Sequence, residues 1–128
     1  MTVAKFLHLN AEILTAELVT VTLPITAQTK QPYGVVHGGI NALIAEEAAS
    51  LGANEALKAA GRLDEVAVGV DIQTHHLASV TQGVLEGRAT PIKIGGRIQT
   101  WQVTIREMIT DTETAFSTVT LTSMSRPK

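Results

Sequence analysis

A short segment with two glycines, an amide and a histidine runs directly into a helix-forming stretch. Residues 29–39 read Thr-Lys-Gln-Pro-Tyr-Gly-Val-Val-His-Gly-Gly, and the stretch after them is rich in Ala, Leu and Glu. A helix start leaves backbone N–H groups without partners and carries a positive partial charge, and glycine lets a substrate approach the backbone closely. Gly38 and Gly39 could therefore donate hydrogen bonds to a carbonyl oxygen that becomes negative in a transition state.

A carboxylate follows on the same helix. Glu46 lies about 10 Å of helical rise beyond Gly39, and Ser50 lies one turn further on the same face. Such a carboxylate can act as a nucleophile or as a general base. Two plainer interpretations stay open: the two glycines only make a tight helix entry, or the glutamate is a solvated helix former. Periodicity also singles out Glu47, which falls in the middle of the apolar stripe, whereas Glu46 lies at its edge.

The elements that must position these residues are one long helix and a set of strands. Apolar residues recur at helical spacing over residues 39–60, with Gly61 as the candidate C-terminal cap; the stripe comprises Ile40, Leu43, Ile44, Ala48 and Leu51. Residues 6–25 indicate two strands and residues 26–34 a loop. Residues 66–72, 82–92, 97–109 and 115–124 alternate with the period of strands. Because short turns join them, we expect successive strands to be antiparallel neighbours. The pattern predicts one α+β domain over residues 1–128.

Composition excludes several classes of protein. The chain is 45% hydrophobic with a net charge of -2, which argues against a disordered tail and against a nucleic-acid partner. The absence of cysteine excludes disulfide scaffolds, thiolate zinc sites and cysteine nucleophiles. No apolar run reaches the ~20 residues of a membrane span, and residues 1–10 show no cleavable leader, so we expect a cytoplasmic protein. Only four residues are aromatic, which leaves little bulk for the core of a monomer and suggests an oligomer.

At this point the sequence resembles a known family. The run TKQPYGVVHGG, followed by a helix bearing ALIAEEAAS, looks like the acyl-CoA thioesterases of the hotdog fold. It is most similar to the branch with the 4-hydroxybenzoyl-CoA, phenylacetic-acid-degradation and 1,4-dihydroxy-2-naphthoyl-CoA thioesterases. Residues 68–77 and 89–101 look like later strands of that branch, so the resemblance covers about residues 6–124. It implies a six-stranded antiparallel sheet wrapped around one long central helix, and hydrolysis of acyl-CoA thioesters with aromatic or other bulky acyl groups.

The resemblance also implies roles for individual residues. Glu46 matches the catalytic carboxylate, as nucleophile or as general base. Gly38 matches the glycine whose backbone N–H polarises the thioester carbonyl, and Gln31 matches the amide that orients it. His37 matches a histidine at the rim that could assist the departing thiol. Ser50 matches a hydroxyl that can hold the hydrolytic water.

One departure concerns the position after the catalytic carboxylate. Relatives usually carry a neutral residue where this chain has Glu47. Two adjacent carboxylates on a buried helix are costly unless one finds a partner or stays protonated. Which of Glu46 and Glu47 dominates therefore stays open.

A second group of residues is expected to bind the CoA part of the substrate, so no separate cofactor is needed. Arg97, Lys93 and Gly96 lie at a glycine-rich turn near which the family binds the nucleotide, and cations suit phosphate. His76 matches a histidine at the end of the strand after the helix, in its own or a neighbouring subunit's site. A solvated edge of a strand is the plainer interpretation of these charges.

Further expectations concern assembly, metals and alternatives. The resemblance implies a homodimer that pairs again into a homotetramer, with sites between subunits. No metal site is expected, because adjacent strand residues such as His75 and His76 point to opposite faces. The alternative function is a non-catalytic acyl-CoA-binding regulatory protein of the same fold. The acyl group is undetermined, with 1,4-dihydroxy-2-naphthoyl as one candidate; the candidates for its pocket are Tyr33, Asn41, Ile44, Leu51 and Leu77.

Overall fold

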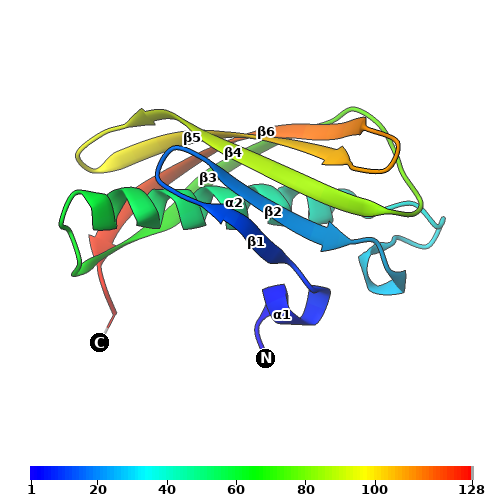
Figure 1. Ribbon diagram of the computed structural model, residues 1–128, viewed down its shortest axis with the longest axis horizontal. Coiled ribbons are helices and arrows are strands. Elements are labelled where there is room, and N and C mark those ends of the chain that lie inside the picture. Colours follow the sequence, from blue (N-terminus) through cyan, green and yellow to red (C-terminus); the bar gives the residue numbers. More distant parts are fainter. Residues whose placement is uncertain (128) are drawn as a thin grey trace.

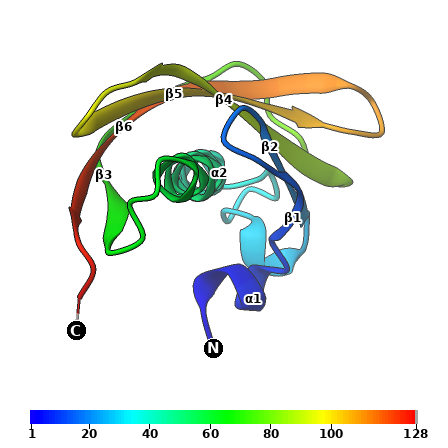
Figure 2. The ribbon, with the colours of Figure 1, turned by 60° about the vertical axis from the view of Figure 1, so that its left-hand side comes forward.

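One long helix lies in the concavity of a curved antiparallel sheet (Figures 1 and 2). The computed structural model describes residues 1–127. The helix is α2 (Gly38–Ala59), and the strands are β1 (Asn10–Leu14), β2 (Val19–Pro24), β3 (Glu65–His76), β4 (Val84–Ile94), β5 (Ile98–Glu107) and β6 (Thr112–Ser125). The strand order is β1-β2-β4-β5-β6-β3. The predicted α+β architecture of one long helix and a six-stranded antiparallel sheet is confirmed.

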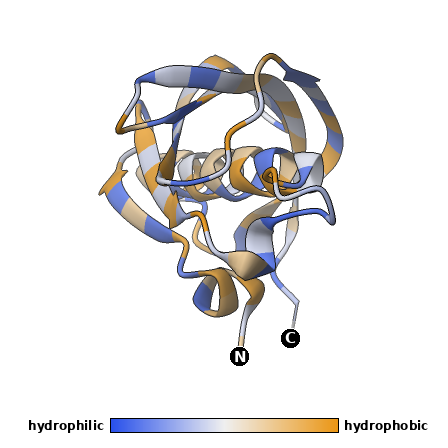
Figure 3. Ribbon diagram, turned by 90° about the vertical axis from the view of Figure 1, so that its right-hand side faces the viewer, coloured by the Kyte–Doolittle hydropathy of each residue, from blue (hydrophilic) through white to orange (hydrophobic). Residues whose placement is uncertain are grey.

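The alternating sequence of the central strands places one face of the sheet against α2. Trp101, Val103 and Ile105 on β5 are fully buried, as are Val119 and Leu121 on β6. The polar residues between them point away from the helix, and alternating hydropathy along the strands is visible in Figure 3. The period of two that predicted these strands therefore also predicted their buried faces.

Two local predictions were wrong. Residues 6 and 7 belong to a short helix, α1 (Val3–Leu7), and not to a strand. Thr2 caps this helix by accepting from the Lys5 N–H at 3.2 Å, and His8 ends it in a left-handed conformation, φ 60°. These local interactions compete with the strand tendency of the apolar residues.

The expected pairing of β3 with β4 was also wrong. β3 pairs with β6 and forms the sheet edge opposite β1. Residues 77–83 are not a tight hairpin turn but a connection from this edge to the middle of the sheet. Its far end is held at Gly83, whose carbonyl accepts from the Ile25 N–H at 2.9 Å. The result places residues 78–80 next to the start of α2, where they matter for the site.

The buried face of α2 is built from small residues. Ala45, Ala48, Ala49, Gly52 and Ala53 are buried against the sheet. Of the predicted apolar stripe, only Ile44 and Ala48 are buried, and Ile40, Leu43 and Leu51 stay half-buried, packed against the core. Small side chains let the helix approach the sheet closely enough to be enclosed by it.

The closest of these approaches predicts the effect of a substitution. A Cβ at Gly52 would lie 2.5 Å from Cη2 of the buried Trp101. That ring is held in place, because its Nε1–H donates to Gln99 Oε1 at 2.9 Å and the Gln99 amide donates to the Ala53 carbonyl at 3.2 Å. Gly52→Ala should therefore lower the free energy of unfolding by about 1–2 kcal/mol, because overpacking outweighs the ~1 kcal/mol gain in helix propensity. Unfolding in urea measures this change in the free energy of unfolding. In a Trp101→Phe background the same substitution should be less destabilising, and equal effects in both backgrounds would contradict the contact.

A buried carboxylate ties the connection near the site to the β5–β6 turn. Glu107 is 1% exposed. It accepts from the backbone N–H groups of Val84, Ile109 and Thr110 at 3.0, 3.0 and 2.8 Å, and from the Thr110 hydroxyl at 2.9 Å. The N–H groups of Ile109 and Thr110 contribute most to lowering the pKa of Glu107 from 4.5 to about 2, against the opposing effect of burial.

This carboxylate should make stability depend on pH in acid. Because folding lowers the pKa of Glu107, its charged form stabilises the fold above pH 4.5, and this contribution is lost as the pH falls toward 2. Glu107→Gln should lower Tm at pH 7 by about 5 °C or more, because an amide cannot satisfy all these donors. Thermal unfolding followed from pH 7 to pH 2 should show the two proteins converging. A constant difference in Tm down to the lowest pH would contradict this role.

Among residues 1–127, no helix combines the length and the apolar character needed to cross a membrane.

Candidate active site

The loop before α2 is a miniature hairpin. Lys30 and Val36 form an isolated antiparallel bridge, and the Gly34 N–H donates to the Gln31 carbonyl at 3.0 Å across the turn. Pro32 fits the second position of this turn, and Gly34 supplies the positive φ of 89° that the return needs. The Val36 N–H donates to the Val80 carbonyl at 3.0 Å, which fastens the hairpin to the 77–83 connection.

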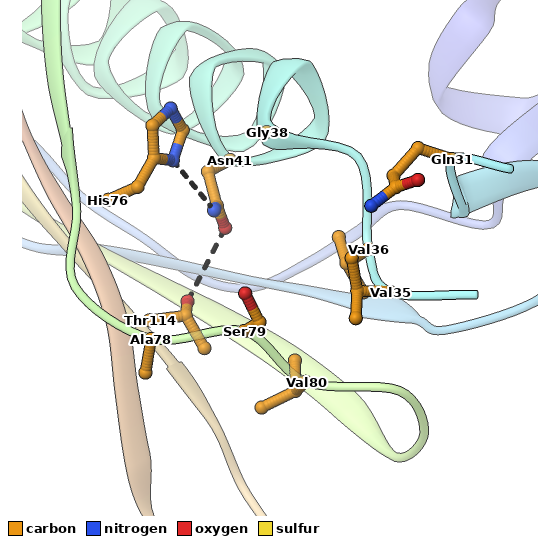
Figure 4. A pocket seen from close by; sticks show the side chains of 10 residues that line it. All are labelled: Gln31, Val35, Val36, Gly38, Asn41, His76, Ala78, Ser79, Val80 and Thr114. Atoms are coloured by element: carbon orange, nitrogen blue, oxygen red, sulfur yellow. Dashed lines mark hydrogen bonds between the residues drawn. The ribbon is translucent and has the colours of Figure 1, made fainter. Parts of the chain in front are cut away.

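This hairpin fixes the orientation of the Gln31 side chain. Gln31 Oε1 accepts the backbone N–H of Tyr33 at 2.6 Å. Because a backbone N–H can only donate, the oxygen must face Tyr33 and the NH2 group must face the other way. Figure 4 shows that nitrogen on the side of the other pocket residues. Gln31 therefore presents a donor, as its predicted role requires.

The start of α2 presents one backbone donor where the sequence suggested two. His37 is the N-terminal cap, and its Nδ1 accepts the Gly39 N–H at 2.8 Å. The Gly39 donor is thus taken, whereas nothing within residues 1–127 accepts the N–H of Gly38. His37 is exposed and does not line the pocket described below; its ring makes this capping contact, and its role toward a departing thiol stays a prediction.

Gln31 and Gly38 line a common pocket of about 190 Å³, the α2 N-terminal pocket (Figure 4). The hairpin contributes Gln31, Val35 and Val36, the helix contributes Gly38 and Asn41, and the other lining residues are His76, Ala78, Ser79, Val80 and Thr114. His76, which the sequence assigned to CoA binding, thus lies in the same pocket as the predicted carbonyl donors. Of the predicted acyl-pocket residues, only Asn41 is found here.

A chain of polar side chains crosses the floor of the pocket. The Thr114 hydroxyl donates toward Asn41 Oδ1 at 3.4 Å and toward the Ile105 carbonyl at 3.3 Å. Asn41 Nδ2 lies 3.3 Å from His76 Nδ1. Thr114 is 1% exposed and Asn41 6% exposed, whereas His76 is exposed. The chain therefore runs from the core to the pocket surface.

Glu46 lies outside this pocket, against β3. It follows Gly38 by about 12 Å of helical rise. Its Oε2 packs on Gly69, so closely that a Cβ there would overlap it. The strand has a bulge at this point, where the register shifts between Gly69 and Asp71. Glu46 is half-buried, and no ion pair or hydrogen bond engages its carboxylate within residues 1–127.

The neighbours of Glu46 on the helix are less distinctive. Ser50 is half-buried one turn on, and only its carbonyl has a described side-chain partner, the Asn54 amide at 2.7 Å. Glu47 is half-buried too. Glu46 differs from Glu47 because its carboxylate packs against Gly69 of the bulged strand β3. This geometry favours Glu46 without deciding its role.

Apart from His76, the predicted CoA-binding residues lie at the other end of the helix. Lys93 and Arg97 are exposed on either side of the β4–β5 turn, and the Gly96 carbonyl accepts from Arg62 at 2.5 Å. Arg62 also pairs with Glu65 at 2.5 Å, and this hydrogen-bonded pair lowers the pKa of Glu65. Arg62 follows the end of α2, which is about 33 Å long. A single chain therefore does not bring this turn to the α2 N-terminal pocket.

Two of these site residues could not be found from motifs. Arg62 and Thr114 belong to separate elements that only the fold brings near the other candidates. A signal for Gly69 was present, because an isolated glycine inside a strand pattern often marks a bulge or a close approach.

Known proteins resemble this chain in sequence and in fold. The profile of the thioesterase superfamily matches residues 33–108. A 1,4-dihydroxy-2-naphthoyl-CoA hydrolase of Listeria monocytogenes is 37% identical over 87 residues, which are 68% of this chain and 68% of that protein. The 1,4-dihydroxy-2-naphthoyl-CoA hydrolase of Escherichia coli is 32% identical over 104 residues, which are 78% of this chain and 71% of that protein.

The structural comparison covers nearly the whole chain. A crystal structure of a thioesterase from Haemophilus influenzae has a TM-score of 0.88 at 31% identity, and the match covers 97% of this chain and 83% of that one. A profile that matches more than half of the chain, together with relatives above 30% identity over two thirds of their length, decides the family. The chain belongs to the thioesterase superfamily and is a thioester hydrolase of the hotdog fold.

Proposed function

We propose that the protein hydrolyses acyl-CoA thioesters to the free acid and CoA, with an aromatic or other bulky acyl group. The observation that carries the proposal is the convergence of two donors, the Gln31 amide and the Gly38 N–H, on one pocket at a helix start. Both suit a thioester oxygen that becomes negative as the carbonyl carbon is attacked. Glu46 supplies the carboxylate, as nucleophile or as base toward water. The C–S bond then breaks, and the thiolate of CoA leaves and takes up a proton. Where Glu46 is the nucleophile, water then hydrolyses the acyl-Glu46 anhydride, which releases the free acid and restores the carboxylate.

The acyl group is tested with a panel of substrates. Two relatives of this chain are 1,4-dihydroxy-2-naphthoyl-CoA hydrolases, so this thioester is the first candidate. Steady-state thiol release should be measured with 1,4-dihydroxy-2-naphthoyl-, benzoyl-, phenylacetyl- and straight-chain acyl-CoA. We expect a higher kcat/KM for the aromatic esters. Tight binding of acyl-CoA without thiol release from any of them would instead support a non-catalytic binding protein.

We further propose that the site forms between two copies of the chain, in a homodimer that can pair again into a tetramer. Three observations support this assembly. Within one chain, Glu46 and Gly38 are separated by about 12 Å of helix. β3 is a twelve-residue edge strand with a free edge, which proteins usually cover. The apolar side chains of Ile40, Leu43 and Leu51 on α2 also stay half-buried in the single chain, and a second subunit could cover them.

An antiparallel pairing of β3 with its copy would also serve CoA binding. In such a pairing the His76 end of one strand lies beside the Glu65 end of the other. The Glu65 end carries Arg62 and the β4–β5 turn with Arg97. The cations of one subunit would then lie near the α2 N-terminal pocket of its partner, where they can contact the CoA phosphates.

Complementation between inactive variants tests the shared site. Gln31→Ala and Glu46→Ala subunits are mixed by co-expression, and activity is compared with each parent alone. If a site takes Gln31 from one subunit and Glu46 from the other, a mixed dimer keeps one intact site. Random mixing should then restore about a quarter of wild-type activity. Activity no higher than the sum of the parents would place both residues of a site in one chain.

A further inference from the structure

We propose that Asn41 holds His76 as the tautomer that carries its hydrogen on Nε2, so that the ring adds a third hydrogen-bond donor beside Gly38. The catalytic part of this inference rests on the proposed thioester hydrolysis. Its structural part rests on the polar chain from Thr114 through Asn41 to His76 at the α2 N-terminal pocket.

The orientation of Asn41 is the first step. The single hydrogen of the buried Thr114 hydroxyl has two oxygens within reach, the Ile105 carbonyl at 3.3 Å and Asn41 Oδ1 at 3.4 Å. With its oxygen toward Thr114, Asn41 turns its NH2 group toward the ring of His76 (Figure 4). An amide NH2 can only donate. Because Asn41 is 6% exposed, its amide depends on these protein partners for its hydrogen bonds.

The tautomer of His76 follows from this donor. In a neutral imidazole one ring nitrogen donates and the other accepts. His76 Nδ1 faces the Asn41 donor at 3.3 Å and must accept, so the hydrogen is on Nε2. In many proteins the hydrogen bond at one ring nitrogen of a histidine determines whether the other ring nitrogen carries the hydrogen.

The ring of His76 lies close to Gly38, so its Nε2–H can act together with the Gly38 N–H. A Cβ built on Gly38 would lie 3.1 Å from His76 Nε2 and 3.0 Å from Cε1, so the edge of the ring lies on the first residue of α2. Standard geometry then puts His76 Nε2 within about 6 Å of the Gly38 nitrogen, close enough for one oxygen to accept from both. The absence of a side chain at Gly38 is what admits the ring. His76 would thus contact the thioester carbonyl, and Asn41 would be its positioning residue.

Ring nitrogen chemical shifts test the tautomer without any substrate. In protein labelled with 15N on histidine, at about pH 8.5 where an ordinary imidazole is neutral, His76 should show a protonated Nε2 and an unprotonated Nδ1. In Asn41→Asp the carboxylate can only accept, so the hydrogen should move to Nδ1. Assignment uses His76→Gln, which removes the resonance. A wild-type ring with its hydrogen on Nδ1 would mean that the amide is reversed, and would overturn the proposal.

Kinetics test the use of the donor. Asn41→Asp is nearly isosteric, and it should lower kcat/KM by at least about tenfold at this pH, through kcat more than KM. His76→Gln, whose amide nitrogen can occupy the place of Nε2, should keep more activity than His76→Asn. The matched control is His75→Gln, since His75 points to the opposite face and stacks on Phe116 with ring centres 4.7 Å apart.

The outcomes separate the two proposals. Wild-type kcat in both Asn41→Asp and His76→Asn would overturn the catalytic role of His76, whatever its tautomer. Failure of the proposed function is read from the wild-type protein alone, as an absence of thiol release from every acyl-CoA. The ring nitrogen shifts decide the tautomer in either case.

Discussion

Glu46→Ala should lower kcat for acyl-CoA hydrolysis by at least ~100-fold, the scale expected for a positioned acid, base or nucleophile. Glu46 is half-buried, its carboxylate is not engaged within residues 1–127, and its Oε2 rests against Gly69 of β3. The Gln31 and Gly38 donors are untouched by this substitution, so substrate binding should change less than turnover. Thiol release under saturating acyl-CoA measures kcat directly.

The neighbouring carboxylate provides the matched control. Glu47→Ala removes the same group one position along the helix, from a residue that is also half-buried. We expect the Glu47→Ala variant to retain most of the turnover, since Glu46 is the carboxylate that packs against Gly69 of the bulged strand. Full activity in Glu46→Ala together with loss of activity in Glu47→Ala would reverse the assignment. Circular dichroism of both variants would show that α2 is intact.

Gly69→Ala should lower kcat by roughly 10- to 100-fold without unfolding the protein. An alanine Cβ at this position would overlap Glu46 Oε2 and lie 3.4 Å from its Cδ. The overlapping atom is the end of a flexible side chain, so the carboxylate swings aside at little cost to the fold. Displacement of a catalytic group by about 1 Å is enough for a loss of this size. The measurements are kcat and Tm of the same preparation.

A buried glycine on another strand separates this effect from a general loss of stability. A Cβ at Gly87 of β4 would overlap a methyl group of the fully buried Ile44. Gly87→Ala should therefore lower Tm by several degrees while kcat of the folded fraction changes little. Gly69→Ala should show the reverse pattern. If Gly69→Ala keeps wild-type kcat, the contact of the Glu46 carboxylate with Gly69 is not needed for turnover.

Much of the fold could be predicted because its patterns are local. The alternation in β5 and β6 predicted both the strands and their buried faces, since a strand with one buried face needs apolar residues at every second position. The long helix was visible from its Ala- and Leu-rich composition and from Gly61, which has a positive φ of 76° just after it. The stripe over Ile40, Leu43 and Leu51 was less informative, because in α2 the small residues face the sheet.

The candidate site was predicted in its parts more than in its arrangement. The hairpin and helix start that carry Gln31 and Gly38 are continuous in sequence, and turn chemistry positions them locally. The cap that His37 forms was not predicted, although it too depends only on neighbouring residues. The place of His76 in the same pocket could not be predicted without the order of the strands.

By itself, the sequence determined the helix, the alternation of the strands and the loop-to-helix motif, because each depends on contacts between residues a few positions apart. Only the tertiary structure decided that β3 pairs with β6 and forms a free edge. That pairing puts Gly69 under Glu46 and the ring of His76 on Gly38. These contacts join residues about 20 to 40 positions apart, and strand order selects them through the burial of the whole sheet around α2, which no local pattern records.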